Sequence, residues 1–137
     1  MSASFSFNAD LRTLKQIRRS IIDAASSIGA RRECIDDVVY AANELIANTI
    51  TYGYHDHSGP IWIDVWSENR ALYVRIRDAA PAFNPLNVPL PRNLIGRGQQ
   101  RAGGLGLFLS RHLLDDLYYR ELPYGGNELT LVKWNAF

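Results

Sequence analysis

The spacing of apolar residues changes from a helical to a strand period near residue 53, and that change constrains the fold more than any other feature. Between residues 11 and 52 the apolar side chains recur every three or four positions, in two stretches over 11–28 and 32–52. This spacing predicts two amphipathic helices. Beyond the turn-rich segment 53–60 the apolar residues alternate over 61–66 and 72–77, which predicts two strands joined as a hairpin.

The rest of the chain supplies one more helix and three more strands. A short strand is predicted over 2–7, a largely apolar and therefore buried helix over 105–117, and a closing hairpin over 117–122 and 128–134. Between them, residues 79–101 carry four of the six prolines and no sustained period, which is typical of a functional or mobile loop. This order favours an α+β fold, with helices in one layer over a largely antiparallel sheet.

Composition limits the classes of protein that the chain can be. With 137 residues, 47% of them hydrophobic, it suits a single domain over 1–137. A formal charge of +1 without a dense basic block gives no indication of nucleic-acid or membrane-surface binding. A single cysteine, Cys34, excludes an internal disulfide, and the N-terminus lacks a signal-peptide layout, so we expect a cytoplasmic protein.

Glu44 and Asn48 are the first candidate functional pair. Their four-residue spacing puts a carboxylate and a carboxamide on one face of the second predicted helix, opposite its apolar stripe. The carboxylate can act as a base, and the amide oxygen can bind Mg²⁺. A solvated helix face explains the same pattern equally well.

Two further segments carry polar or glycine signals. Asp78 follows the strand over 72–77, where it can accept a hydrogen bond from an exocyclic amine or simply begin a turn. Gly103, Gly104 and Gly106 lie at the start of the third predicted helix, where free backbone N–H groups can bind phosphates. A flexible hinge with close helix packing explains these glycines about as well. The pattern is neither a P-loop nor a dinucleotide-binding fingerprint.

Taken in order, the three segments resemble the motifs of one family. The first is Glu44-x-x-x-Asn48 followed by Tyr52 and Tyr54. The second is Asp78 with Phe83-Asn84-Pro85 shortly after, and the third is Gly103-Gly104-x-Gly106-Leu107. The chain resembles the small GHKL-type ATP-binding proteins, most closely the anti-sigma-factor serine/threonine kinases of bacteria.

The resemblance implies a fold and a set of roles. The fold is a two-layer α/β sandwich of the Bergerat type, with helices on one face of a mainly antiparallel mixed sheet and a mobile ATP lid at about 85–103. Glu44 would be the catalytic base and Asn48 the Mg²⁺ ligand. The residues expected to contact ATP are Asn48, Asp78, Ala80, Phe83, Gly103, Gly104, Leu105, Gly106 and Leu107.

The same resemblance implies partners and leaves one alternative open. The expected activity is ATP- and Mg²⁺-dependent phosphorylation of an anti-anti-sigma protein with a STAS domain, together with sequestration of a sigma factor. The protein is expected to be a homodimer. The alternative is a regulatory module that senses or has lost the nucleotide and transfers nothing. Ala80, where the family usually has glycine, favours that alternative slightly, since a methyl group there can obstruct the backbone or the ligand.

Other polar residues give weaker indications of function. The segment His55-Asp56-His57 lacks a third ligand at zinc spacing, so a solvated loop explains it better. His112 lies within the predicted buried helix and is interpreted as a packing residue. Arg92, Arg97 and Arg101 in the expected lid suit phosphate contacts, partner contacts or plain solvation.

Overall fold

The computed structural model describes residues 2–87 and 104–137, and its five strands form one antiparallel sheet. The strands are β1 (Ser2–Ala9), β2 (Gly59–Glu68), β3 (Ala71–Asp78), β4 (Asp116–Glu121) and β5 (Asn127–Lys133). Their order across the sheet is β1-β2-β3-β5-β4, and all four neighbouring pairs are antiparallel. The sheet is therefore antiparallel throughout its described strands, without the parallel pair that a mixed sheet requires.

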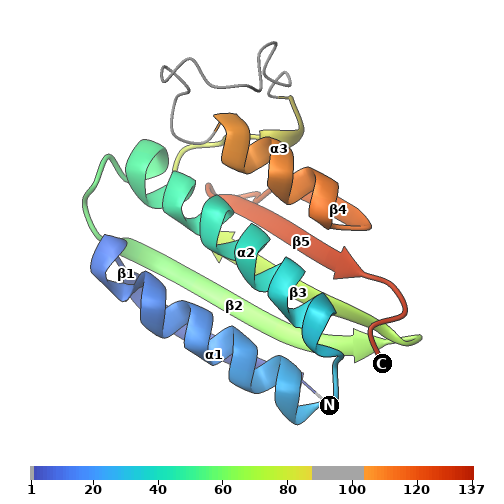
Figure 1. Cartoon of the computed structure of the whole chain (residues 1–137). Helices are drawn as coiled ribbons and strands as arrows, with labels where there is room; N and C mark the ends of the chain where they lie inside the picture. The colour runs from blue at the N-terminus through green and yellow to red at the C-terminus, as the bar shows by residue number, and fades with distance from the viewer. Residues whose placement is uncertain (1, 88–103) are drawn as a thin grey trace.

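Three helices cover one face of this sheet (Figure 1). They are α1 (Leu14–Ser27), α2 (Arg32–Asn48) and α3 (Gly104–Leu113), and α2 packs between the other two. A 3-10 turn over Leu11–Thr13, capped by Asp10, leads into α1. The predicted two-layer α+β architecture is confirmed. None of the described helices is long and apolar enough to cross a bilayer.

The core lies between the two layers and is built by the two periodicities seen in the sequence. Ile21 of α1, Ile46 of α2 and Ile63 of β2 are at most 1% exposed. Burying each such side chain contributes on the order of 1.5–3 kcal/mol. The alternate residues of β2, including Trp62 and Trp66, lie on the other sheet face, where Trp66 stacks on Tyr73 with ring centroids 5.0 Å apart.

The third helix ends four residues earlier than its apolar pattern predicts. It stops at Leu113, whose carbonyl accepts a hydrogen bond from Lys133 Nζ at 2.8 Å. The Asp115 N–H then donates to the Val132 carbonyl at 2.9 Å, and β4 begins at the next residue. Pairing with β5 satisfies backbone groups that a longer helix would use internally, so tertiary pairing overrides the local pattern. His112, predicted as buried packing, is exposed and stacks on Phe108.

The end of the second helix is widened rather than regular. Its α-helical part ends at Asn48, and Thr49–Gly53 forms a π-helical turn in which the Tyr54 N–H donates to the Thr49 carbonyl at 2.8 Å. Such turns are frequent at functional sites. Within the expected lid, Pro85–Asn87 forms a 3-10 turn. Gly103 and the three arginines at 92, 97 and 101 lie outside the described residues.

Candidate functional site

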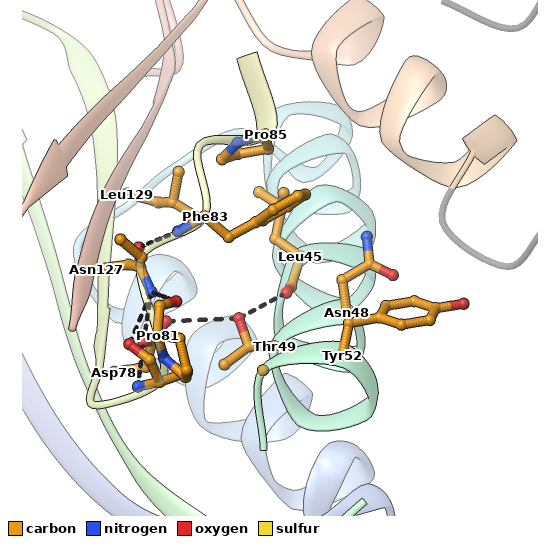
Figure 2. A pocket seen from close by; sticks show the side chains of 13 residues that line it. Leu45, Asn48, Thr49, Tyr52, Asp78, Pro81, Phe83, Pro85, Asn127 and Leu129 are labelled. Atoms are coloured by element: carbon orange, nitrogen blue, oxygen red, sulfur yellow. Dashed lines mark hydrogen bonds between the residues drawn. The ribbon is translucent and has the colours of Figure 1, made fainter. Parts of the chain in front are cut away.

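A cavity of about 210 Å³ opens between the C-terminal end of α2, the chain that follows β3, and the start of β5 (Figure 2). Sequence segments that are far apart meet here, because β3 and β5 are neighbours in the sheet and α2 crosses above them. The lining residues are Leu45, Asn48, Thr49, Tyr52, Gly53, Asp78, Ala80, Pro81, Ala82, Phe83, Pro85, Asn127 and Leu129. Four of the predicted ATP contacts, Asn48, Asp78, Ala80 and Phe83, are among them.

Asp78 is the buried carboxylate of this cavity and is only 3% exposed. Its Oδ1 accepts hydrogen bonds from Asn127 Nδ2 and from the Ala80 backbone N–H, both at 2.9 Å. Burial raises the pKa of Asp78, and these hydrogen bonds partly oppose the rise because they favour the charged form. A buried carboxylate with hydrogen bonds on one oxygen is well suited to accept a hydrogen bond from an amine on the other.

Thr49 stands beside the second oxygen of that carboxylate (Figure 2). Its hydroxyl lies 3.2 Å from the Leu45 carbonyl and 3.5 Å from Asp78 Oδ2. A hydroxyl has one proton to donate, so the shorter contact to Leu45 takes it and the long contact leaves Oδ2 weakly satisfied. Oδ2 can therefore accept a further hydrogen bond from a ligand.

Asn127 belongs to this site, although sequence reasoning used it only as part of the family resemblance and did not predict it as a site residue. It is 5% exposed, and its Nδ2 donates to Asp78 Oδ1 and to the Pro81 carbonyl at 3.1 Å. Its Oδ1 accepts from the Phe83 N–H at 2.9 Å and from the Tyr119 hydroxyl at 2.6 Å. The available signal was the closing hairpin, because its register puts Asn127 directly opposite Asp78. Without the pairing of β3 with β5, an asparagine after two glycines looks like a turn residue.

Tyr54 fixes the other side of the segment that follows Asp78. Its hydroxyl accepts a hydrogen bond from the Ala79 N–H at 2.8 Å and donates one to the Pro60 carbonyl at 2.7 Å. Burial is the main cause of its raised pKa, so the hydroxyl stays protonated and able to donate. The chain after β3 is thus held from two directions, by Tyr54 and by Asn127.

Ala80 adopts an ordinary backbone conformation, so its replacement of the usual glycine does not strain the backbone. Ala80 is not among the residues with positive φ, and it is 3% exposed on the cavity wall. Its methyl group has space because residue 53 is glycine: a Cβ added to Gly53 would lie 2.7 Å from the Ala80 Cβ. The backbone at Ala80 therefore does not need glycine, and Gly53 accommodates the methyl group.

This complementarity predicts the effect of Gly53→Ala. The added methyl overpacks the contact with Ala80 and is expected to lower the free energy of unfolding by about 1–3 kcal/mol, measured by urea denaturation. Adding Ala80→Gly should restore most of that loss, since it removes the opposing methyl group. Additive losses in the double variant would contradict the packing argument.

Glu44 lies one helical turn before Asn48 and faces the first turn of α3. A Cβ added to Gly106 would collide with the Glu44 carboxylate, so this glycine permits the close approach of the two helices. Gly104 and Leu105 belong to the same first turn of α3. Leu107 is 3% exposed and packs in the core. Its side chain anchors the first turn of α3 to the core and does not line the cavity.

The fold and this cavity define a class of protein, and sequence comparison agrees. The family model of the histidine kinase-like ATPase domain matches residues 7–133, so the chain belongs to that family. Serine-protein kinase RsbW of Listeria monocytogenes serovar 1/2a is 31% identical over 116 residues, which cover 76% of this chain and 71% of that protein. The anti-sigma F factor of Clostridium acetobutylicum is 22% identical, and the match covers 85% of this chain and 81% of that protein.

A solved structure supports the fold independently. The crystal structure of the RsbU and RsbW domains of Rv1364c from Mycobacterium tuberculosis superimposes with a TM-score of 0.67 at 16% sequence identity. The match covers 98% of this chain and 32% of that chain, so this protein spans about a third of the solved chain. At that identity the likeness concerns the fold alone.

Proposed function

We propose that this protein is an ATP-dependent serine/threonine protein kinase that acts as an anti-sigma factor. The observation that carries the proposal is Asp78, a buried carboxylate with one weakly satisfied oxygen, in a cavity that also contains Asn48. An adenine amine supplies the donor that this oxygen lacks. The RsbW and anti-sigma F relatives support the regulatory part of the proposal. The substrate would be an anti-anti-sigma protein with a STAS domain, and the sequestered partner a sigma factor.

In the proposed reaction Glu44 removes the proton from the acceptor serine or threonine hydroxyl. The hydroxyl oxygen then attacks the γ-phosphorus, the bond to the β,γ-bridging oxygen breaks, and ADP leaves with that electron pair. The backbone N–H groups at the first turn of α3, around Gly104 and Gly106, are suited to stabilise the phosphate charge. Phosphoryl transfer depends mainly on such positioning and charge stabilisation, which this arrangement supplies.

A Mg²⁺ ion fits the residues of the cavity through Asn48. Among the described residues no cluster of three or more His, Cys, Asp or Glu side chains could hold a metal by itself. Mg²⁺ is commonly held by one or two protein oxygens, with phosphates and water completing the octahedron. The amide oxygen of Asn48 on the cavity wall would be such a ligand. When bound, the ion would supply positive charge that neutralises the phosphate groups.

Asn48→Ala tests this assignment by calorimetric titration with ATP, with and without Mg²⁺. The wild type is expected to bind ATP more tightly when Mg²⁺ is present, and the variant is expected to lose that enhancement because the ion lacks its protein ligand. Tyr52→Phe, a change one turn further along the same face, is the control and should keep the Mg²⁺ effect. Equal enhancement in wild type and Asn48→Ala would overturn the metal-ligand role. Absence of ATP binding to the wild type would overturn the proposed function.

Gly106→Ala tests whether the contact between Glu44 and α3 matters for transfer. Alanine favours the helix by about 0.5–1 kcal/mol, but its methyl group displaces the Glu44 carboxylate. A displacement of about 1 Å can lower a rate on the order of 10²-fold, so we expect transfer to fall by roughly that factor. The measurement is radiolabel transfer to the partner protein. In a Glu44→Ala background the same change should have no further effect, because its target is gone.

The ordinary backbone at Ala80 bears on the alternative of a module without transfer activity. The substitution of glycine was its one supporting feature, and Ala80 shows neither positive φ nor a collision with Gly53. These observations remove the backbone part of the argument for loss of the nucleotide. We retain homodimerisation, through α1 and β1, as part of the proposal, and a sedimentation measurement of molecular mass tests it.

A further inference from the structure

The two oxygens of the Asp78 carboxylate are not equivalent. Oδ1 accepts two hydrogen bonds of 2.9 Å, from Asn127 Nδ2 and the Ala80 N–H, and a carboxylate oxygen has two lone pairs to offer. Oδ2 has the 3.5 Å approach of the Thr49 hydroxyl. The Asn127 backbone N–H also acts on this carboxylate and favours its charged form. The carboxylate can therefore offer a ligand one oxygen, and the other is occupied.

Asn127 maintains this asymmetry and cannot itself turn toward a ligand. Its amide donates to Asp78 and to the Pro81 carbonyl, while its carbonyl accepts from the Phe83 N–H and the Tyr119 hydroxyl. Flipping the amide would set donor against donor at the Phe83 N–H, and acceptor against acceptor at Asp78 and the Pro81 carbonyl, so one orientation satisfies every partner. At 5% exposure the side chain is a positioning residue that acts on a ligand through Asp78.

Purine bases differ in what they require from such a carboxylate. A 6-aminopurine presents one exocyclic amine beside a ring nitrogen that accepts, so it requires one acceptor from the carboxylate, and Oδ2 can be that acceptor. Guanine presents two adjacent N–H donors, which pair with both oxygens of one carboxylate. With Oδ1 occupied, the second guanine donor would be buried without an acceptor, which is unfavourable.

We infer that Asn127 determines base specificity: by occupying Asp78 Oδ1 it makes the carboxylate a single acceptor, which selects 6-aminopurine nucleotides against guanine nucleotides. The inference rests on the proposed function, since it requires that the nucleotide base enters this cavity. It assigns Asn127 a role in discrimination that differs from general support of the fold. Loss of support weakens every nucleotide alike, whereas loss of this role changes the ratio between nucleotides.

The test is calorimetric titration of the full chain with ATP, ITP and GTP, each with Mg²⁺, for wild type and Asn127→Ala. In the wild type we expect the order ATP, ITP, GTP from tightest to weakest, because the hypoxanthine of ITP has one N–H donor on this edge and guanine has two. In Asn127→Ala a lone pair of Oδ1 becomes free. The ratio of the GTP Kd to the ATP Kd should then fall by about tenfold, the effect of one hydrogen bond to a charged group.

Tyr119→Phe is the matched control. It removes the 2.6 Å hydrogen bond to Asn127 and loosens the same network, but it leaves the Asn127 amide on Asp78. This variant should lower thermal stability without changing the GTP-to-ATP ratio. A ratio that changes equally in Tyr119→Phe would assign the effect to loosening and overturn the inference.

The outcomes separate this inference from the proposed function. Wild type that binds ATP, with an unchanged GTP-to-ATP ratio in Asn127→Ala, overturns the role of Asn127 and leaves the ATP site standing. If Asn127→Ala does not fold, the wild type still decides, because tighter binding of GTP than of ITP would show that Asp78 accepts two donors. Wild type that binds none of the three nucleotides overturns the proposed function and this inference with it.

Discussion

Glu44→Gln is expected to reduce phosphoryl transfer by about 10²–10⁴-fold while ATP stays bound, because general-base catalysis contributes that much and the amide cannot take a proton. Glu44 does not line the cavity, so the nucleotide loses no contact with it. Glutamine has the same shape, and it still fits against Gly106 of α3. The two measurements are calorimetric ATP affinity and the rate of radiolabel transfer to the partner protein.

The control for Glu44 lies on the same helix. Glu33→Gln removes an equal charge from the first turn of α2, where Glu33 is exposed and pairs with Arg31. Exposed pairs contribute about 0–1 kcal/mol, so transfer should stay at the wild-type rate. If Glu44→Gln transferred phosphate as fast as wild type, another group would have to be the base. If it lost ATP binding as well, its role would be structural.

Asp78→Asn is expected to weaken ATP binding by about tenfold to a hundredfold and to leave the fold intact. The asparagine oxygen can take the place of Oδ1 and accept from Asn127 and the Ala80 N–H. Its NH₂ then replaces Oδ2 and meets the adenine amine as donor against donor. A hydrogen bond to a charged group contributes about 1.5–3 kcal/mol, which corresponds to about tenfold to a hundredfold in affinity. Titration of ATP into both proteins measures the change.

The pH dependence of stability gives a second readout for Asp78. Burial raises its folded-state pKa, so the folded protein binds this proton more tightly than the unfolded chain does. The resulting stability is fully present below the unfolded pKa and is lost as pH rises through the raised folded pKa. The stability of wild type relative to Asp78→Asn should therefore decrease from acid to neutral pH, as measured by urea denaturation. ATP binding to the wild type should change in the opposite direction, because it needs the carboxylate.

Asp64→Asn is the matched control for the Asp78 variant. Asp64 is also a strand carboxylate, but it lies on the other face of the sheet, where Arg75 and Ser4 hold its pKa below the ordinary value despite its partial burial. Its replacement should leave ATP affinity unchanged. The stability that Asp64 contributes is present above its unfolded pKa and is lost as pH falls through the lowered folded pKa, the opposite sign to Asp78. A similar loss of ATP affinity in both variants would indicate a general effect of charge.

Local patterns predicted most elements, and the errors have identifiable physical causes. Amphipathic spacing located α1 and α2, and alternation located β2 and β3, because a single buried face dictates each period. The third helix was predicted too long because apolar residues on all sides give no face to locate its end. Its end is decided by the pairing of Asp115 and Asp116 with Val132 of β5, a contact that local sequence does not encode.

The candidate site likewise contains residues that the sequence indicated and residues that only tertiary contacts placed there. Glu44, Asn48 and Asp78 were recognisable because helix spacing and a strand end are local features, and motif order supplied the rest. The sequence by itself thus determined the element order, the two-layer class and the family motifs. The tertiary structure alone decided that Asn127 holds Asp78, that Thr49 stands beside the open oxygen, and that Gly53 accommodates Ala80. Those relations arise from strand register and helix packing, which bring together residues that lie 27 to 49 positions apart in the chain.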